Sequence, residues 1–105
     1  MNIGIDLTYI PRFKNKDTLA KKILSINEYN EYLNSFNKEE YLASRWCLKE
    51  AYIKAKELNI LGVNLNTIEI NKKENGAVFI KVGSDSYKAS LSHEKDYCIG
   101  VVYYD

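Results

Sequence analysis

The segment "SRWCLKEAYIKA", Ser44 to Ala55, lies in residues 38–58, within the longest stretch of the chain without glycine or proline, and these residues predict its main helix. At about 100° per residue, residues 41–58 place Arg45, Lys49 and Lys56 on one narrow basic stripe, with apolar side chains nearly everywhere else. A helix that is apolar almost all round is a buried one. We therefore expect it to form the centre of the fold.

Two charged residues, Glu50 and Lys54, fall inside the apolar arc, one helical turn apart. An exposed pair of this kind stabilises a helix by only about 0.2–0.5 kcal/mol, whereas burying one costs several kcal/mol per ion. Two interpretations stay open. The pair lies partly exposed at the rim of the core, or Glu50 supplies an oxygen ligand and Lys54 a positive charge for one anionic substrate.

Strand signals surround this helix. Residues 2–10, "NIGIDLTYI", alternate apolar and other side chains, with Gly4, Asp6 and Thr8 on one side. Helices are expected over about 17–26 and 27–37. After the main helix, "TIEIN", "AVFIKV", "YKASLS" and "YCIGVVYY" predict strands, with a hairpin at Asn75-Gly76. The order predicts an α+β fold, one domain over residues 1–105, with an antiparallel meander packed on the long helix.

Composition excludes several classes of protein. The chain has 105 residues, 46% hydrophobic and 28% charged, which argues against disordered, fibrous and membrane proteins. A net charge of +1 removes the usual electrostatic argument for nucleic-acid binding. Cys47 and Cys98 are expected to be reduced core residues. Because no leader peptide or membrane-spanning run is evident, we expect a cytoplasmic protein.

Basic residues gather near the N-terminus: Arg12, Lys14, Lys16, Lys21 and Lys22. This cluster is either a solvated helix face or a docking surface for an acidic partner.

A second carboxylate is available for a metal site. Asp6 lies in an apolar strand, where an acid needs a partner. Together with Glu50 it would form a two-carboxylate site for a divalent cation such as Mg²⁺, beside Lys54. The dipeptide Ser92-His93 does not indicate a serine nucleophile, because neighbours on a strand point to opposite faces.

Three motifs together resemble the holo-acyl-carrier-protein synthase family of small 4'-phosphopantetheinyl transferases. They are Gly4-Ile5-Asp6-Leu7 followed by Arg12-Phe13, "RWCLKEAYIKA" at Arg45–Ala55, and "SLSHEKDY" at Ser90–Tyr97. The resemblance covers nearly the whole chain and implies the 4'-phosphopantetheinyl transferase fold. It also implies transfer of the phosphopantetheine arm of coenzyme A to a serine of an acyl carrier protein. Adenosine 3',5'-bisphosphate would be released, in support of fatty acid and lipid biosynthesis.

The resemblance also implies roles for individual residues. Asp6 and Glu50 would hold Mg²⁺, and Lys54 would neutralise the pyrophosphate of coenzyme A. Arg12 and the basic segment after it would dock the carrier protein. The nucleotide would be contacted by Arg45, Ser92 and His93, and by the Asn75-Gly76 hairpin of a neighbouring subunit in a homotrimer. Lys49 and Lys56 are left to face water.

Two alternatives to the enzyme are kept. One is a non-catalytic carrier-protein or nucleotide-binding module on the same fold. The other is a nucleic-acid-binding domain that uses the lysine-rich segment, which the net charge disfavours. The expected partners are therefore an acyl carrier protein and coenzyme A, without nucleic acid or membrane.

Overall fold

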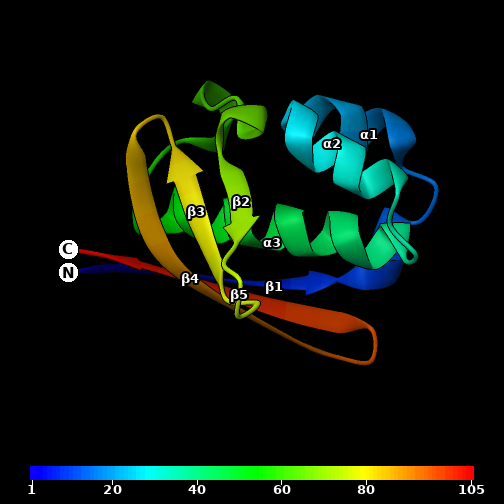
Figure 1. Cartoon of the computed structure of the whole chain (residues 1–105). Helices are drawn as coiled ribbons and strands as arrows, with labels where there is room; N and C mark the ends of the chain where they lie inside the picture. Colours follow the sequence, from blue (N-terminus) through cyan, green and yellow to red (C-terminus); the bar gives the residue numbers. More distant parts are fainter.

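A computed structural model describes all residues, 1–105, and has one antiparallel sheet with a long helix lying across it (Figure 1). The strands are β1 (Asn2–Tyr9), β2 (Glu69–Lys72), β3 (Val78–Val82), β4 (Asp85–Glu94) and β5 (Tyr97–Tyr104). Their order is β1-β5-β4-β3-β2, so β2 to β5 form a meander and β1 adds to its last strand. The predicted α+β architecture is confirmed.

The main helix is α3 (Lys38–Ala55), which ends three residues earlier than the pattern predicted. Asn37 caps its start by accepting the N–H of Glu40 at 3.1 Å, which satisfies one of the free donors of the first turn. After Lys56 the chain turns, with Glu57 at a φ of 55°, a backbone conformation that ends a helix. Gly4 of β1 lies directly against the α3 backbone at Ala51, so strand and helix approach closely.

Two short helices, α1 (Asp17–Ile23) and α2 (Ile26–Leu33), cover α3 on the side away from β1 (Figure 1). The helix predicted from Asn27 begins one residue earlier because Ser25 and Glu28 form a capping box. Single 3-10 turns follow β1 (η1, Ile10–Phe13) and α3 (η2, Ile60–Gly62; η3, Leu65–Thr67).

The expectation that Lys49 faces water is wrong. The side chain of Lys49 is fully buried, and Arg45 is only 6% exposed, although both belong to the basic stripe. Helical projection gives the direction of a side chain but not what covers it. Here α1, α2 and β2 cover this side of α3. Among the three residues of the basic stripe, only Lys56 is partly exposed.

The two faces of β1 are also unlike the usual arrangement. Gly4 and Thr8 face α3 and are buried, whereas Ile3, Ile5 and Leu7 are 65, 54 and 65% exposed. The apolar side of this strand therefore points away from the core. Cys47 and Cys98 are buried and not bridged, which agrees with their expected role as reduced core residues.

Candidate active site

Asp6 and Lys54 meet where β1 crosses α3. The Lys54 Nζ lies 3.1 Å from Asp6 Oδ1 and donates to the backbone carbonyl of Ile5 at 3.0 Å. The Asp6 side chain is 15% exposed and that of Lys54 is 53% exposed. The sequence predicted that Lys54 pairs with Glu50, one turn away on α3, but its partner is Asp6. Lys54 projects outward at the edge of the contact between β1 and α3, which we call the seam.

Thr8 completes the surroundings of Asp6. It is buried, and its Oγ1 donates to Asp6 Oδ2 at 2.6 Å, so both carboxylate oxygens have a protein partner. Sequence reasoning missed Thr8 as a site residue. The available signal was the alternation of β1, which puts Thr8 on the same face as Asp6.

Glu50 belongs to the same site. Partial burial raises its pKa, and the negative charge of Asp6 raises it further. The positive charges of Lys54 and Arg12 act in the opposite direction. Because these charges act on one carboxyl group, the structure brings Asp6, Glu50, Lys54 and Arg12 into one electrostatic neighbourhood.

This donor set suits Mg²⁺. Two carboxylates repel each other in a partly buried place, and a divalent cation would relieve that repulsion. No cluster of three or more His, Cys, Asp or Glu side chains surrounds them. Mg²⁺ is commonly held by one or two carboxylates, with waters and substrate phosphates completing its octahedron. Asp6 and Glu50 are the residues that would hold it.

Arg45 and His93 line a second feature, a hollow of about 300 Å³. The Arg45 guanidinium stacks on the ring of Tyr41 at 4.0 Å, and its Nε has no hydrogen-bond partner. His93 on β4 places Nε2 3.4 Å from Glu40 Oε1 on α3. Lys72 also lines the hollow. Arg45 and Lys72 bring two positive charges to the hollow, against the single carboxylate of Glu40, which suits an anionic ligand.

Gly76 lies next to this hollow. It takes a φ of 88° in the turn that joins β2 and β3, and Asn75 accepts the N–H of Ala77 at 3.0 Å. The adjoining hollow of about 290 Å³, lined by Gly76, shares Lys72 and His93 with the first. The hairpin of this chain thus adjoins its own His93.

Ser92 is not brought to the Arg45 hollow. It pairs with Ile99, which in turn pairs with Leu7, so it lies on the outward face of the sheet. Those two apolar residues and Ser92 line a different hollow there.

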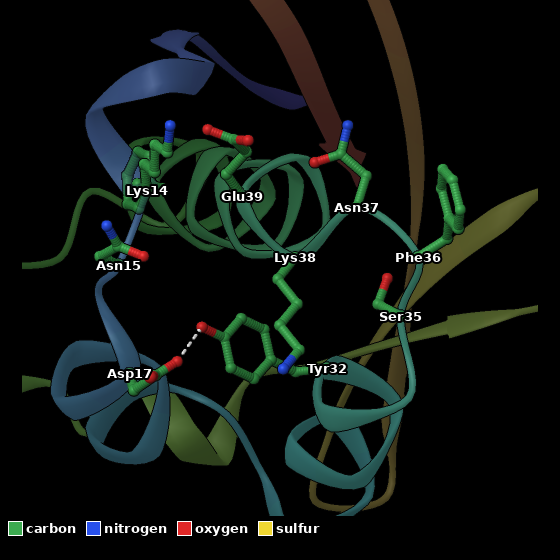
Figure 2. A pocket seen from close by; sticks show the side chains of 10 residues that line it. Lys14, Asn15, Asp17, Tyr32, Ser35, Phe36, Asn37, Lys38 and Glu39 are labelled. Carbon is green, nitrogen blue, oxygen red and sulfur yellow. Dashed lines mark hydrogen bonds between the residues drawn. The ribbon is translucent and has the colours of Figure 1, made fainter.

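Of the residues predicted for the site, only Lys14 of the basic docking segment lines the hollow of about 470 Å³ between the segment after β1 and the start of α3 (Figure 2). Its floor is the hydrogen bond from the Tyr32 hydroxyl to Asp17 at 2.6 Å, which joins α2 to α1. Burial and this bond raise the pKa of Tyr32 to about 12.

The chain is similar to known proteins over nearly its full length. The model of the 4'-phosphopantetheinyl transferase superfamily matches residues 2–102. The holo-[acyl-carrier-protein] synthase of Mycoplasmopsis pulmonis is 40% identical over 101 residues, which cover 95% of this chain and 86% of that protein. The Bacillus subtilis synthase is 32% identical over 110 residues, 95% of this chain and 91% of that one.

Solved structures agree. The holo-[acyl-carrier-protein] synthase of Neisseria meningitidis has a TM-score of 0.86 at 26% identity, covering 96% of this chain and 94% of that one. The Helicobacter pylori enzyme, solved in complex with coenzyme A, has a TM-score of 0.81 at 28% identity, covering 95 and 96%. This chain therefore belongs to the 4'-phosphopantetheinyl transferase superfamily and, within it, to the holo-[acyl-carrier-protein] synthase family.

Proposed function

We propose that the protein transfers the 4'-phosphopantetheine arm of coenzyme A to a serine of an apo acyl carrier protein, in support of fatty acid and lipid biosynthesis. The observation that carries this proposal is the convergence of Asp6, Glu50 and Lys54 at the seam of β1 and α3. Family membership supplies the reaction class, and this seam supplies charges suited to it.

The reaction is a phosphoryl transfer. The serine oxygen forms a bond to the β-phosphorus of coenzyme A as the bond to the bridging oxygen breaks. Adenosine 3',5'-bisphosphate leaves, and the serine proton passes to water. Lys54, held beside Asp6 and half in solvent, offers its ammonium to the pyrophosphate oxygens. Mg²⁺, bound by Asp6 and Glu50, would supply further charge stabilisation and orient the phosphates.

The nucleotide end is assigned to the Arg45 hollow. Arg45 and His93 offer donors to a phosphate group. Gly76 lines the adjoining hollow, and Asn75 precedes it in the same turn. Ser92 enters this assignment only through the family resemblance, because it lies on the other face of β4.

An acidic carrier protein is the proposed acceptor. Arg12 is exposed in the turn after β1, close enough to Glu50 for its charge to lower that pKa. Lys21 and Lys22 are exposed in the last turn of α1. Because these cations lie on one stretch of chain that begins beside the site, they suit an acidic helix that presents a serine to the phosphoryl group next to Glu50.

We also propose a homotrimer with sites between subunits. The side of the sheet opposite α3 exposes an outer apolar face: Ile3, Ile5, Leu7, Tyr9, Tyr97 and Ile99. Register pairs Leu7 with Ile99 and Tyr9 with Tyr97, so these side chains form one continuous patch on β1 and β5. Such a patch favours burial against other copies of the chain.

None of the helices combines the length and the hydropathy that crossing a bilayer would require. A cytoplasmic location is part of the proposal, since acyl carrier proteins and coenzyme A would be met there.

The test is a labelling assay with coenzyme A, apo carrier protein and Mg²⁺, read as a mass gain of one phosphopantetheine arm. Glu50→Gln is expected to lower the rate by at least about 10²-fold, because it removes one metal ligand. Glu57→Gln is the matched control, an exposed glutamate just beyond α3. Failure of the wild type with every divalent metal would refute the enzyme. Coenzyme A binding without transfer would instead favour the non-catalytic module.

A further inference from the structure

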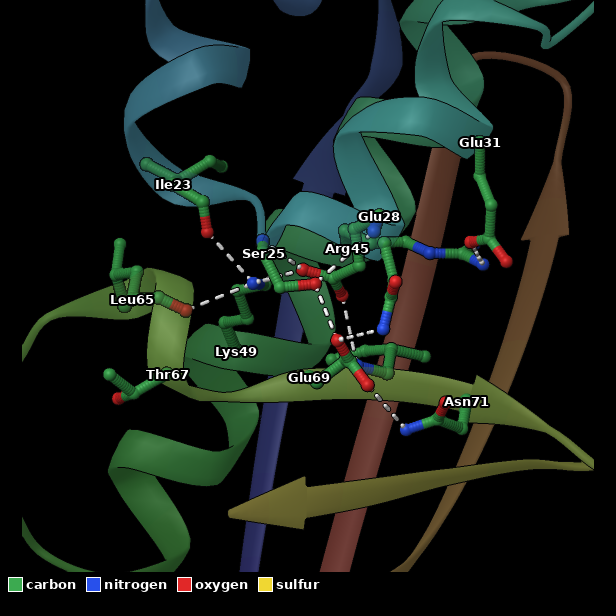
Figure 3. A network of polar contacts seen from close by, with 12 residues as sticks. Ile23, Ser25, Glu28, Glu31, Arg45, Lys49, Leu65, Thr67, Glu69 and Asn71 are labelled. Atoms are coloured by element: carbon green, nitrogen blue, oxygen red, sulfur yellow. Dashed lines mark hydrogen bonds and ion pairs between the residues drawn. The ribbon is translucent and has the colours of Figure 1, made fainter. Parts of the chain in front are cut away.

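Lys49 lies at the centre of a buried polar network (Figure 3). Its Nζ donates to the carbonyl of Ile23 at 2.8 Å, to that of Leu65 at 2.9 Å and to Glu28 Oε1 at 2.7 Å. An ammonium has three N–H donors, so none is left unpaired. The Lys49 side chain is fully buried, and that of Glu28 is 1% exposed.

Glu28 extends the network to two further segments. Its Oε1 also accepts the backbone N–H of Ser25 at 2.9 Å, and its Oε2 accepts that of Ile70 at 2.9 Å. The ion pair thereby connects the end of α1, the start of α2, α3, η3 and the second residue of β2.

Stability is a weak reason for this arrangement. A buried ion pair rarely stabilises more than apolar side chains of the same size would, because both charges lose their water. Apolar burial, which holds α1 and α2 to α3 through Ile23 and Leu24, is non-directional. Hydrogen bonds are directional and tolerate little displacement. The network therefore determines where α1 lies, not only that it is attached.

The two ends of the network adjoin the two halves of the proposed site. On α3, Lys49 immediately precedes Glu50, one of the two metal carboxylates. On α1, the carbonyl that Lys49 holds belongs to Ile23, which immediately follows Lys21 and Lys22 in the proposed docking surface. One side chain thus connects the carrier-docking helix to the helical turn that carries Glu50.

We propose that Lys49 and Glu28 are positioning residues that hold α1 in register with Glu50, so that a docked carrier presents its serine to the phosphoryl group. This inference rests on the proposed transferase function. Displacements of about 1 Å can lower an enzymatic rate by about 10²-fold. Loss of the network should therefore impair use of the carrier protein. Coenzyme A binding should persist, because neither Arg45 nor His93 forms a hydrogen bond or ion pair with Lys49 or Glu28. Arg45 lies one turn before Lys49 but contacts Ser44 and Glu31, and His93 contacts Glu40.

The test variant is Lys49→Met combined with Glu28→Gln. It removes both charges together, which avoids an uncompensated buried ion, and glutamine keeps an oxygen for the Ile70 N–H. The control is Ile80→Ala, which removes fully buried apolar contacts on β3 and forms no part of the network. It is expected to lower the thermal unfolding midpoint, because it leaves a cavity in the core. Both are compared with the wild type at a temperature where circular dichroism shows all three folded.

Two readouts separate positioning from stability: kcat/KM for the apo carrier protein at saturating coenzyme A, and the Kd of coenzyme A by calorimetry. We expect the network variant to lose at least about tenfold in kcat/KM, with an unchanged Kd, and the control to retain both values. Carrier kinetics equal to the wild type in a folded network variant would overturn the proposal. So would equal losses in both variants.

If the double variant does not fold, Glu28→Gln alone is measured in the same way. It keeps the shape of the side chain and an oxygen for Lys49, but removes the charge opposite the buried ammonium, so it is measured at the highest temperature at which circular dichroism shows it folded. A loss confined to the carrier parameters supports the proposal, and unchanged parameters overturn it. Absence of transfer by the wild type would instead refute the proposed function, so the two failures are distinguishable.

Discussion

Gly4→Ala should separate β1 from α3 and disable the site. A methyl group at residue 4 would lie 2.6 Å from the backbone nitrogen of Ala55 and still nearer to the carbonyl oxygen of Ala51, whereas ordinary contact begins at 3.4 Å. The obstacle is helix backbone, which cannot rotate aside. The seam must therefore open by at least about 0.8 Å, the difference between those two distances.

Such overpacking costs about 1–3 kcal/mol or more. In a domain of about 100 residues, a loss of about 3 kcal/mol lowers Tm by roughly 12–24 °C. Because Asp6 follows Gly4 on the same face of β1, the opening also moves Asp6 from Glu50, and transfer should fall by about 10²-fold.

Thermal unfolding by circular dichroism and the carrier labelling assay measure the two effects. Gly62→Ala is the matched control, because no atom lies within 4 Å of the added methyl group. A Gly4→Ala protein with the Tm and activity of that control would refute the reasoning. Loss of stability with full activity in the folded fraction would refute only the link to Asp6.

Three further outcomes are expected. Thr8→Val removes the donor to Asp6 and should cost about 1.5–3 kcal/mol in urea unfolding; an unchanged midpoint would contradict this. Leu7→Asp should give monomers by light scattering, whereas Leu61→Asp, 92% exposed outside the outer apolar face, should not. Folding raises the pKa of Tyr32 from 10.0 to about 12, so the stability tied to its proton is complete below pH 10 and lost as pH approaches 12. The difference in urea midpoint between wild type and Tyr32→Phe should therefore shrink between pH 9 and 11.5, and a constant difference would exclude this linkage.

Local pattern predicted most elements of the fold. Helical periodicity placed α3 within three residues, and alternation with Asn75-Gly76 predicted the meander. The same patterns identified Glu50 and Asp6 as candidate site residues, because each is a charged residue in an apolar element. The reason is that these signals depend on neighbouring residues alone, through backbone geometry and the spacing of apolar side chains.

The partners of the charged side chains were not predictable in this way. The sequence paired Lys54 with Glu50, one turn away, but the nearest carboxylate is Asp6, 48 positions distant. It left Lys49 in water, although Glu28, 21 positions distant, holds it in the core. A contact between two elements depends on how they pack against each other. The spacing of residues within one element does not contain that information.

By itself, then, the sequence determined the elements, their order and the residues that could carry the chemistry, because each is encoded in short-range geometry and residue type. Only the tertiary structure decided which side of each element is covered. It turned Ile3 and Leu7 outward and Asp6 inward on β1, and it buried Lys49 beneath α1 and α2. Burial is a property of what packs against a face, and for these faces the covering segments come from distant parts of the chain.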